Sequence, residues 1–368
     1  MVRKFHKRRR IKLKIKILLF MIISTTIIFI NAPTMLIAQI LFYQTMPNFG
    51  RFSLNSGENF DITQIEESIL LDRYQNIVGI HNISDIITVQ EDFSTYVSAF
   101  NLYFSEHSIE ELRNVNTLLN RFYSIDRNTG IIEEYLNIDY FLNSDLRIEK
   151  SNYPQVLVFH THAMSEFFID SQNTYDKYEG VVGVGVTLVN HLRYTYGLNV
   201  IHYKGVYDKI DGIITRSGSY ERIEPSIRNI LSQYPTIQLV IDVHRDGVPA
   251  TIQRETLVRY INGKPVAPIM FVNGLSAINE DGHIRHLQNI PNNYTRTNLA
   301  LSFNLQKALQ ESFPGITRRL YLTPFRYINH LAPLSTLVEI GTQLNTKEEA
   351  HNATEFLAYA IYSVLFAQ

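Results

Sequence analysis

The feature that most restricts the fold of this chain is a regular alternation in its second half. After Tyr153, apolar runs of strand length alternate with longer segments whose apolar residues recur at helical spacing. The predicted strands are 155–159, 198–202, 237–243, 266–272 and 335–340, and the predicted helices are 180–196, 224–234, 293–312 and 347–366. Continuous Val, Ile and Leu runs are typical of strands buried on both faces, so we predict an α/β fold with a central sheet flanked by helices.

Polar side chains follow three of these runs at their carboxyl ends. His160 and His162, with Glu166 close behind, follow the first run, His244 follows the third, and Glu339 lies near the end of the last. Because ligands collect outside the carboxyl ends of strands in open α/β sheets, we expect these side chains to converge. Two imidazoles and a carboxylate can hold a zinc ion with one position left for water, and a further carboxylate can take the proton of that water.

Each of these residues also has a less specific interpretation. A single histidine at a strand end usually serves as a hydrogen-bonding residue. A carboxylate inside an apolar strand, as at Glu339, is costly unless it is paired, protonated or near a metal, and a buried salt bridge with Arg245 would satisfy it. His283 and His286 lie one helical turn apart and form an alternative metal pair, but their neighbours 279–282 are typical of a solvated surface loop.

Charge and cysteine content exclude several other kinds of site. The sequence contains no cysteine, so a metal must be held by histidines and carboxylates. The net charge of −1 divides unevenly, because residues 1–16 hold nine Lys or Arg and no acid, which leaves −10 for residues 17–368. The main body is therefore acidic, which argues against a nucleic-acid-binding surface.

The first fifty residues indicate a membrane segment. Residues 17–50 contain no Asp, Glu, Lys or Arg, and 17–43 is long enough to span a bilayer. By the positive-inside rule, the basic tail 1–16 stays in the cytoplasm and the rest of the chain lies outside, anchored to the cell membrane by a single pass. A cleaved signal peptide with a site near Ala38 is the alternative, but the uncharged segment is longer than a usual signal core.

The domain organisation follows from these patterns. The main domain is predicted at 151–368. Residues 44–150 show mixed signals, with helix-like spacing at 61–74 and 108–123 and β-branched residues at 77–89, and we interpret them as an extracytoplasmic spacer or small accessory region. The last helix has a predicted start, because Thr346 and Glu349 stand in capping-box spacing before its apolar face.

Several motifs of the second half resemble the stage II sporulation protein P family. The His160-Thr161-His162 segment followed by Glu166 is similar to the opening motif of that family. The later motifs occur in the family order, namely Gly180 to Gly185, Tyr220-Glu221-Arg222, Val240 to Asp246, Leu337 to Gly341 and Asn345 to Glu349. The run from Gly180 to Gly185 lacks the spacing and strand-turn context of a nucleotide site.

The resemblance implies a fold like that of zinc N-acetylmuramoyl-L-alanine amidases and zinc carboxypeptidases. It implies His162, Glu166 and His244 as ligands of Zn2+ and Glu339 as the catalytic carboxylate. The related zinc-peptidase pattern has two residues between ligand His and Glu, but three separate His162 from Glu166, so His160 stays open as an alternative ligand or an orienting residue.

The resemblance further implies hydrolysis of the amide between N-acetylmuramic acid and L-alanine, with stem-peptide endopeptidase activity as an additional possibility. We predict Arg245 as the residue that polarises the carbonyl or steers peptide carboxylates. The implied setting is sporulation engulfment, where the partners are peptidoglycan, a lytic transglycosylase (stage II sporulation protein D) and a membrane scaffold (stage II sporulation protein M).

Two alternative functions use the same fold. A non-catalytic, membrane-tethered wall-binding scaffold would be expected to have lost at least one of the four matched polar residues, and none is lost. An exported zinc carboxypeptidase would need a cation for the terminal carboxylate of its substrate, for which Arg222, Arg318 and Arg319 are the candidates.

Overall fold

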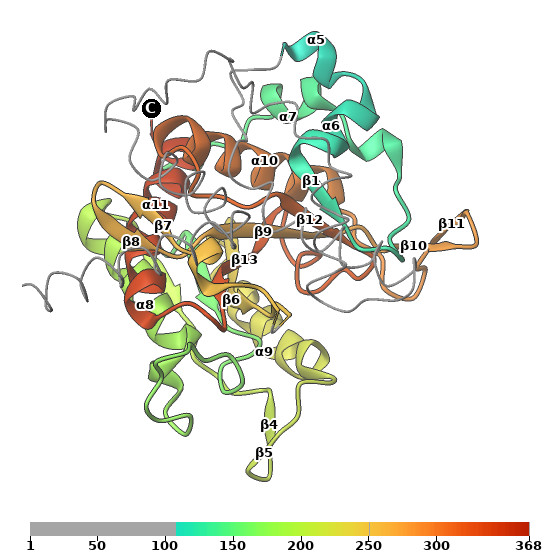
Figure 1. The fold of residues 1–368 in the computed structure, drawn as a ribbon. Helices are drawn as coiled ribbons and strands as arrows, with labels where there is room; N and C mark the ends of the chain where they lie inside the picture. Colours follow the sequence, from blue (N-terminus) through green and yellow to red (C-terminus); the bar gives the residue numbers. More distant parts are fainter. Residues whose placement is uncertain (1–107, 250, 368) are drawn as a thin grey trace, which may run out of the picture. The chain divides into compact units, whose positions relative to one another are not determined.

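The fold is known from a computed structural model, which describes residues 108–249 and 251–367 (Figure 1). Its centre is a seven-stranded sheet with the order β1-β12-β9-β13-β6-β2-β3. These strands are β1 (Tyr123–Ile125), β2 (Val156–Phe159), β3 (Val200–His202), β6 (Leu239–Asp246), β9 (Ile269–Gly274), β12 (Leu320–Thr323) and β13 (Leu334–Thr342). All neighbours are parallel except β9 and β13, which are antiparallel. The predicted α/β fold with a mostly parallel central sheet is therefore confirmed.

Each predicted apolar run contains a strand of this sheet. The runs 155–159, 198–202, 237–243, 266–272 and 335–340 correspond to β2, β3, β6, β9 and β13. Two strands were not predicted, β1 and β12, which lie side by side at one edge. Neither lies in a continuous apolar run of the length that marks the five predicted strands.

Four long helices accompany the sheet, and all were predicted within a few residues. They are α8 (Val181–Asn190), α9 (Ser219–Gln233), α10 (Thr295–Ser312) and α11 (Lys347–Leu365). Helix α9 begins five residues before the predicted start and holds Pro225 in its interior. The predicted capping box of α11 is confirmed, because the Thr346 side chain accepts from the Glu349 N–H and Glu349 accepts from the Thr346 N–H.

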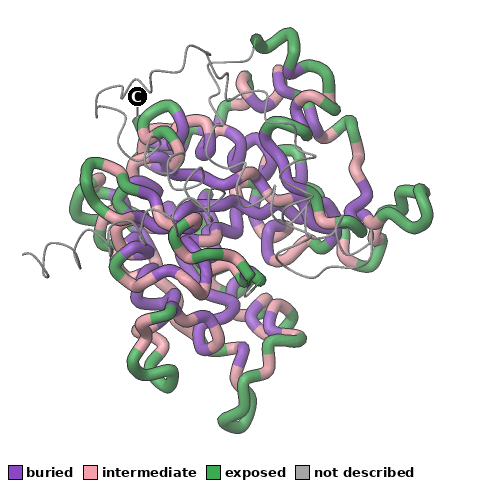
Figure 2. The backbone as a smooth tube through the Cα atoms, in the orientation of Figure 1, coloured by how far each residue is buried: buried purple, intermediate pink, exposed green. Residues whose placement is uncertain are grey.

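The helices divide between the two faces of the sheet according to strand periodicity. Val156 and Val158 of β2 pack in the large core with α8, α10 and α11, whereas Leu157 and Phe159 pack with Ile223 and other side chains of α9. This alternation is the period of two expected for a strand covered on both sides. Figure 2 shows the sheet as buried and the connecting loops as exposed.

The segment that precedes β2 also packs on this core. Helices α5 (Ile109–Leu112), α6 (Val115–Phe122) and α7 (Ile138–Asn143) lead up to and follow β1. The rings of Phe122 and Phe141 lie 5.3 and 5.4 Å from that of Phe303 in α10. Helices α5 and α6 fall within the predicted helix-like stretch 108–123. The domain boundary near residue 151 stays a prediction, and residues 108–148 contribute side chains to the same core.

The predicted cytoplasmic tail 1–16, the membrane segment 17–43 and the patterns at 61–74 and 77–89 lie outside the described residues. Within 108–249 and 251–367, no helix combines the length and apolar character needed to cross a bilayer.

Candidate metal centre

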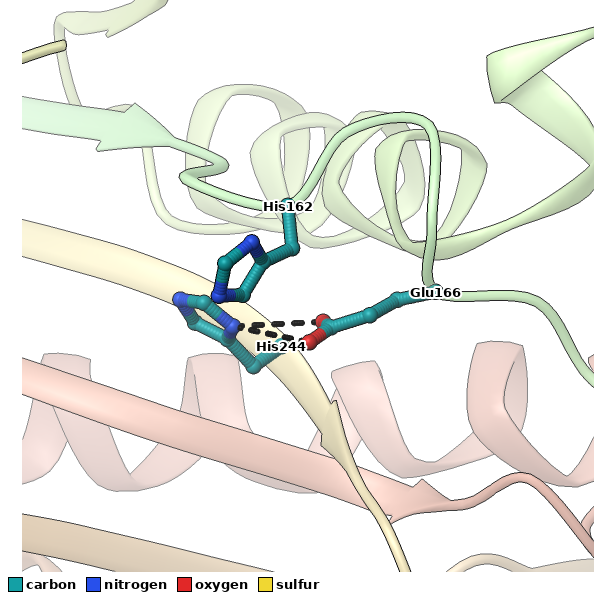
Figure 3. Close-up of side chains that lie close together, drawn as sticks. All are labelled: His162, Glu166 and His244. Atoms are coloured by element: carbon teal, nitrogen blue, oxygen red, sulfur yellow. Dashed lines mark hydrogen bonds and ion pairs between the residues drawn. The ribbon is translucent and has the colours of Figure 1, made fainter. Parts of the chain in front are cut away.

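Three buried side chains, those of His162, Glu166 and His244, lie together near the carboxyl ends of two neighbouring strands (Figure 3). His244 belongs to β6, whereas His162 and Glu166 come from the loop that follows β2. One nitrogen or oxygen atom of each lies within 4.8 Å of the others. In the part of the chain that the structure describes, this is the one group of three such side chains close enough to share a metal ion.

The alternation of side chains along β6 decides which of its residues face this cluster. Asp242 and His244 project from one face of the strand, and Val243 and Arg245 from the other. His244 is paired in register with Glu339 of β13, so these two side chains project from the same face of adjacent strands. Glu339 therefore stands beside the cluster without belonging to it.

Glu339 is half-buried and has a high proton affinity. Its Oε2 is buried and accepts no hydrogen bond from the described residues, and no ion pair joins it to Arg245. Burial, together with the nearby Asp246 and Glu166 carboxylates, raises the pKa of Glu339 well above its usual range against the opposing effect of His244. A carboxylate in this environment accepts a proton readily, as a general base must.

His244 lies between two carboxylates. Its Nδ1 is 3.2 Å from Glu166 Oε2, and its Nε2 is 2.9 Å from Asp242 Oδ1. Burial lowers the pKa of His244, but the charges of Asp242 and Glu166 raise it more, so the net pKa is well above the usual value. The two carboxylates thus increase the proton affinity of the His244 ring, and metal binding at such a ring competes with protons.

Glu166 keeps its negative charge in this buried position. Its Oε1 accepts from the Arg216 guanidinium at 2.8 Å, and its Oε2 accepts from the backbone N–H of Arg245 at 3.1 Å. Burial raises the pKa of Glu166, but His244, His162 and Arg216 lower it more, and the result lies well below the usual range. An ionised carboxylate is the form that binds a metal ion.

His162 completes a donor set suited to zinc. Its ring stands edge-on to those of His244 and Tyr220, with centroids 5.3 and 5.5 Å apart. Burial lowers the pKa of His162 to about 4, so the ring is neutral near pH 7, and its buried Nδ1 has no hydrogen-bond partner in the described chain. Figure 3 shows the other nitrogen of this ring on the side of His244. Two imidazoles and one carboxylate are a zinc donor set.

His160, the alternative ligand, points to a different environment. Its Nδ1 lies 3.0 Å from the carbonyl oxygen of Val243, and its Nε2 lies 2.9 Å from Nε2 of His202. Because a carbonyl oxygen can only accept, the His160 proton is assigned to Nδ1, and His202 then donates to His160 Nε2. Burial lowers the pKa of His160 to about 4 and that of His202 to about 2. Both ring nitrogens of His160 are thus in use, and His162 is the histidine of this motif that reaches the cluster.

The glycine-rich run 180–185 serves close packing around this loop. A Cβ on Gly180 would lie 2.3 Å from the backbone oxygen of Glu166, and one on Gly183 would lie 2.1 Å from that of Tyr178. A Cβ on Gly185 would lie 2.4 Å from Cε1 of His160. A side chain at Gly180 or Gly185 would therefore collide with the segment that carries Glu166 and His160.

Arg245 stabilises the loop that carries Glu166. Its Nε donates to the backbone oxygen of Phe167 at 2.9 Å, and its Nη1 lies 3.3 Å from the backbone oxygen of Asp246. Its guanidinium is directed at these backbone oxygens. Its action on the substrate carbonyl stays a prediction. The cation that contacts the cluster is instead Arg216, whose side chain is 47% exposed.

The other candidates from the sequence lie elsewhere. His283 and His286 are exposed residues of β11 (His283–His286), which forms a surface hairpin with β10 (Ala277–Glu280). Arg222 donates to the backbone oxygens of Tyr207, Ser217 and Thr215, and Arg318 is paired with Asp246 at 2.6 Å. The alternative metal pair is therefore not assembled at the cluster, Arg222 is held by backbone oxygens, and Arg318 is held by Asp246.

Three residues at the site were not predicted. Asp242 receives the backbone N–H and the hydroxyl of Thr161 at 2.9 and 2.6 Å and lies against His244. Tyr220, in the first turn of α9, stacks its ring 6.4 Å from that of His244. Arg216 is the third. Asp242 and Tyr220 both lie in motifs that resemble the family, although neither was assigned to the site. Asp242 had a further signal, since an acid inside the apolar run 237–243 needs a partner, as Glu339 does.

Comparison with known protein families agrees with this geometry. Residues 103–362, well over half of the chain, match the family model described as stage II sporulation protein P. The chain belongs to the stage II sporulation protein P family. The match includes every residue of the cluster and Glu339. No curated protein sequence matches the chain at a significant level.

Two solved structures are similar to part of this chain, at low sequence identity. The CwlD amidase of Clostridioides difficile, solved in complex with the GerS lipoprotein, is 14% identical, with a TM-score of 0.35 over 57% of this chain and 95% of its own. The apo N-acetylmuramyl-L-alanine amidase Ami1 of Mycobacterium abscessus is 12% identical, with a TM-score of 0.33 over 58% of this chain and 99% of its own.

Proposed function

We propose that this family member is a zinc-dependent peptidoglycan amidase that hydrolyses the amide between the lactyl group of N-acetylmuramic acid and L-alanine. The observation that carries the proposal is the buried cluster of His162, Glu166 and His244 with Glu339 in register beside His244. Membership of the stage II sporulation protein P family supports peptidoglycan as the substrate.

The proposed mechanism assigns a distinct task to each residue. His162, Glu166 and His244 would hold the zinc ion, which when bound supplies Lewis-acid activation of water and of the amide carbonyl. Glu339 accepts a proton from the attacking water and delivers it to the leaving amine. The raised pKa of Glu339 favours the first transfer, and its position beside His244 keeps it within the site.

The surrounding residues hold the ligands in place. Asp242 lies against Nε2 of His244 and is itself fixed by Thr161, so it orients the imidazole. The Tyr220 ring packs on both His162 and His244 and limits their rotation. Glu166 offsets the charge of the metal, and its pairing with Arg216 keeps the carboxylate aimed at the cluster.

The full set of polar residues favours an enzyme over a non-catalytic wall-binding scaffold, because a scaffold has no use for the unpartnered, buried Glu339 Oε2. We also propose that the chain is held in the cell membrane by residues 17–43, with this domain outside, and that it acts during engulfment in sporulation beside stage II sporulation proteins D and M. Stem-peptide endopeptidase activity is part of the same proposal.

Mass spectrometry of purified peptidoglycan after incubation with the zinc-loaded protein tests the proposal. Amidase action releases peptides that begin with L-alanine and leaves glycan strands with free lactyl groups. Endopeptidase action instead splits cross-links and leaves peptides on the glycan. A chelator and the Glu339→Gln variant should each abolish release. If the zinc-loaded protein left every lactyl amide and every cross-link intact, the proposed function would be wrong.

A further inference from the structure

A pocket of about 380 Å³ lies directly beside the metal loop. One wall is the loop itself, through Ser165 and Phe167 on either side of Glu166. The opposite wall is the hairpin of β4 (Lys209–Ile210) and β5 (Ile213–Ile214), which projects from the domain in Figure 1. Tyr175, 84% exposed, lies at the edge. Any molecule in this pocket is in contact with neighbours of a proposed zinc ligand.

The hairpin is joined firmly to the metal loop. Its two-residue turn has positive φ at both Asp211 (48°) and Gly212 (85°), as tight hairpin turns require. At its base the fully buried Asp208 carboxylate accepts from the backbone N–H of Met164 at 3.0 Å and from the Ser165 hydroxyl at 2.6 Å. The pocket is therefore a built part of the site, since its two walls share a buried hydrogen-bond network.

One cation, Lys209, lines the pocket. Lys209 is half-buried with its Nζ 5.5 Å from the centre of the Tyr175 ring, and it forms no ion pair with any described residue. Arg216, just beyond the hairpin, donates to the Ser165 hydroxyl at 3.0 Å as well as to Glu166. The nearest buried acid, Asp208, accepts hydrogen bonds from the Met164 N–H and the Ser165 hydroxyl. Of the side chains that line the pocket, only that of Lys209 is charged.

Resting on the proposed function, we propose that this pocket binds the free α-carboxylate of the second stem-peptide residue, on the leaving-amine side of the scissile bond. In peptidoglycan that residue is a glutamate joined through its side-chain carboxyl, so its α-carboxyl is free unless it has been amidated. The pocket lies beside the cluster because Ser165 and Phe167, which line it, flank Glu166 in the metal loop. Lys209 supplies the charge, and Arg216 lies between the pocket and the metal ligand.

Two muropeptides that differ only in this group test the proposal, one with the free α-carboxylate and one with the carboxamide. A charge-assisted hydrogen bond contributes about 1.5–3 kcal/mol, so the zinc-loaded wild type should favour the carboxylate by roughly 10- to 100-fold in kcat/KM. Lys209→Gln should bring this ratio close to one, and Lys209→Arg should preserve it. Lys204→Gln is the matched control, because Lys204 also lies over a tyrosine ring, at 5.8 Å, but does not line the pocket.

Calorimetry with the products L-alanyl-γ-D-glutamate and its α-amide separates this proposal from the proposed function. Tighter binding of the carboxylate form by the wild type, with the difference lost in Lys209→Gln, supports the pocket proposal even if no muropeptide is cleaved. The absence of cleavage would then overturn the amidase function alone. Equal binding and equal cleavage of the two forms by the wild type would overturn the pocket proposal. A Lys209→Gln variant that weakened both forms equally would overturn it as well.

Discussion

Replacing Gly185 by alanine tests how helix α8 fits against the metal loop. In an ordinary helix interior, Gly→Ala stabilises by about 0.5–1 kcal/mol because alanine has the higher helix propensity. Here the new Cβ would lie 2.4 Å from Cε1 and 2.5 Å from Nε2 of His160, and 3.2 Å from Nε2 of His202. Carbon atoms in contact normally stand about 3.5–4.0 Å apart, so a gap of about 1 Å must open.

The His160 ring cannot yield without losing contacts, because Val243 and His202 hold its two nitrogens. Overpacking costs about 1–3 kcal/mol, and a lost hydrogen bond adds about 1 kcal/mol. After the gain in helix propensity is subtracted, we expect Gly185→Ala to lower the free energy of unfolding by about 1–3 kcal/mol. For a domain of this size this lowers Tm by roughly 2–12 °C.

Thermal unfolding followed by circular dichroism, with a chelator present so that no metal contributes, measures the change. Gly247→Ala is the matched control, since a Cβ there has no described atom within 4 Å. We expect its Tm to stay close to that of the wild type. A Gly185→Ala protein with the same or a higher Tm would refute the packing argument, because helix propensity would then outweigh the contact with His160.

Three further predictions concern the ligands, the buried histidines and the membrane. Glu166→Gln should lose zinc, whereas Glu339→Gln should keep about one equivalent of zinc by elemental analysis. The rate of muropeptide release by Glu339→Gln should fall by about 10²–10⁴-fold. If Glu339→Gln lost zinc and Glu166→Gln kept it, the roles of the two residues would be exchanged. Burial lowers the pKa of His202 to about 2, so below pH ~6.5 the unfolded chain takes up a proton that the folded protein does not. The free energy of unfolding should therefore decrease as the pH is lowered from ~6.5 towards ~2, by up to about 1.4 kcal/mol per pH unit from this group. Urea titrations of His202→Gln should show a shallower dependence of this free energy on pH. Full-length protein should sediment with membranes after a high-salt wash, and a soluble form that begins near Gln39 would contradict a retained anchor.

Most of the sheet could be predicted because its strands lie in continuous apolar runs of the sequence. The run 237–243 reads as a buried strand, and its alternation also explains why His244 faces the cluster while Arg245 faces the loop of Phe167. The order of the strands was not predictable. It depends on pairings such as β1 with β12, whose residues Tyr123 and Leu320 lie almost two hundred positions apart.

The residues of the site also divide into those that the sequence predicts and those that it does not. His162, Glu166 and His244 could be brought together by one rule, because all three follow apolar strands that end at the same edge of the sheet. Arg216 and Tyr220 follow no strand of the central sheet. They reach the cluster because the β4–β5 hairpin and the first turn of α9 fold over it, which is a tertiary contact with no local pattern.

The position of β13 has a consequence for when the protein can act. This strand is the last of the sheet to be synthesised, yet it lies between β9 and β6 and joins two halves of three strands each. It also carries Glu339. The helix that follows, α11, ends at Leu365, whose backbone oxygen accepts a hydrogen bond from the Ile148 N–H. A chain synthesised only as far as β12 therefore lacks both the central strand and Glu339, the proposed general base. For the proposed wall hydrolase, the proposed site can be complete only after β13 has been made and has entered the sheet.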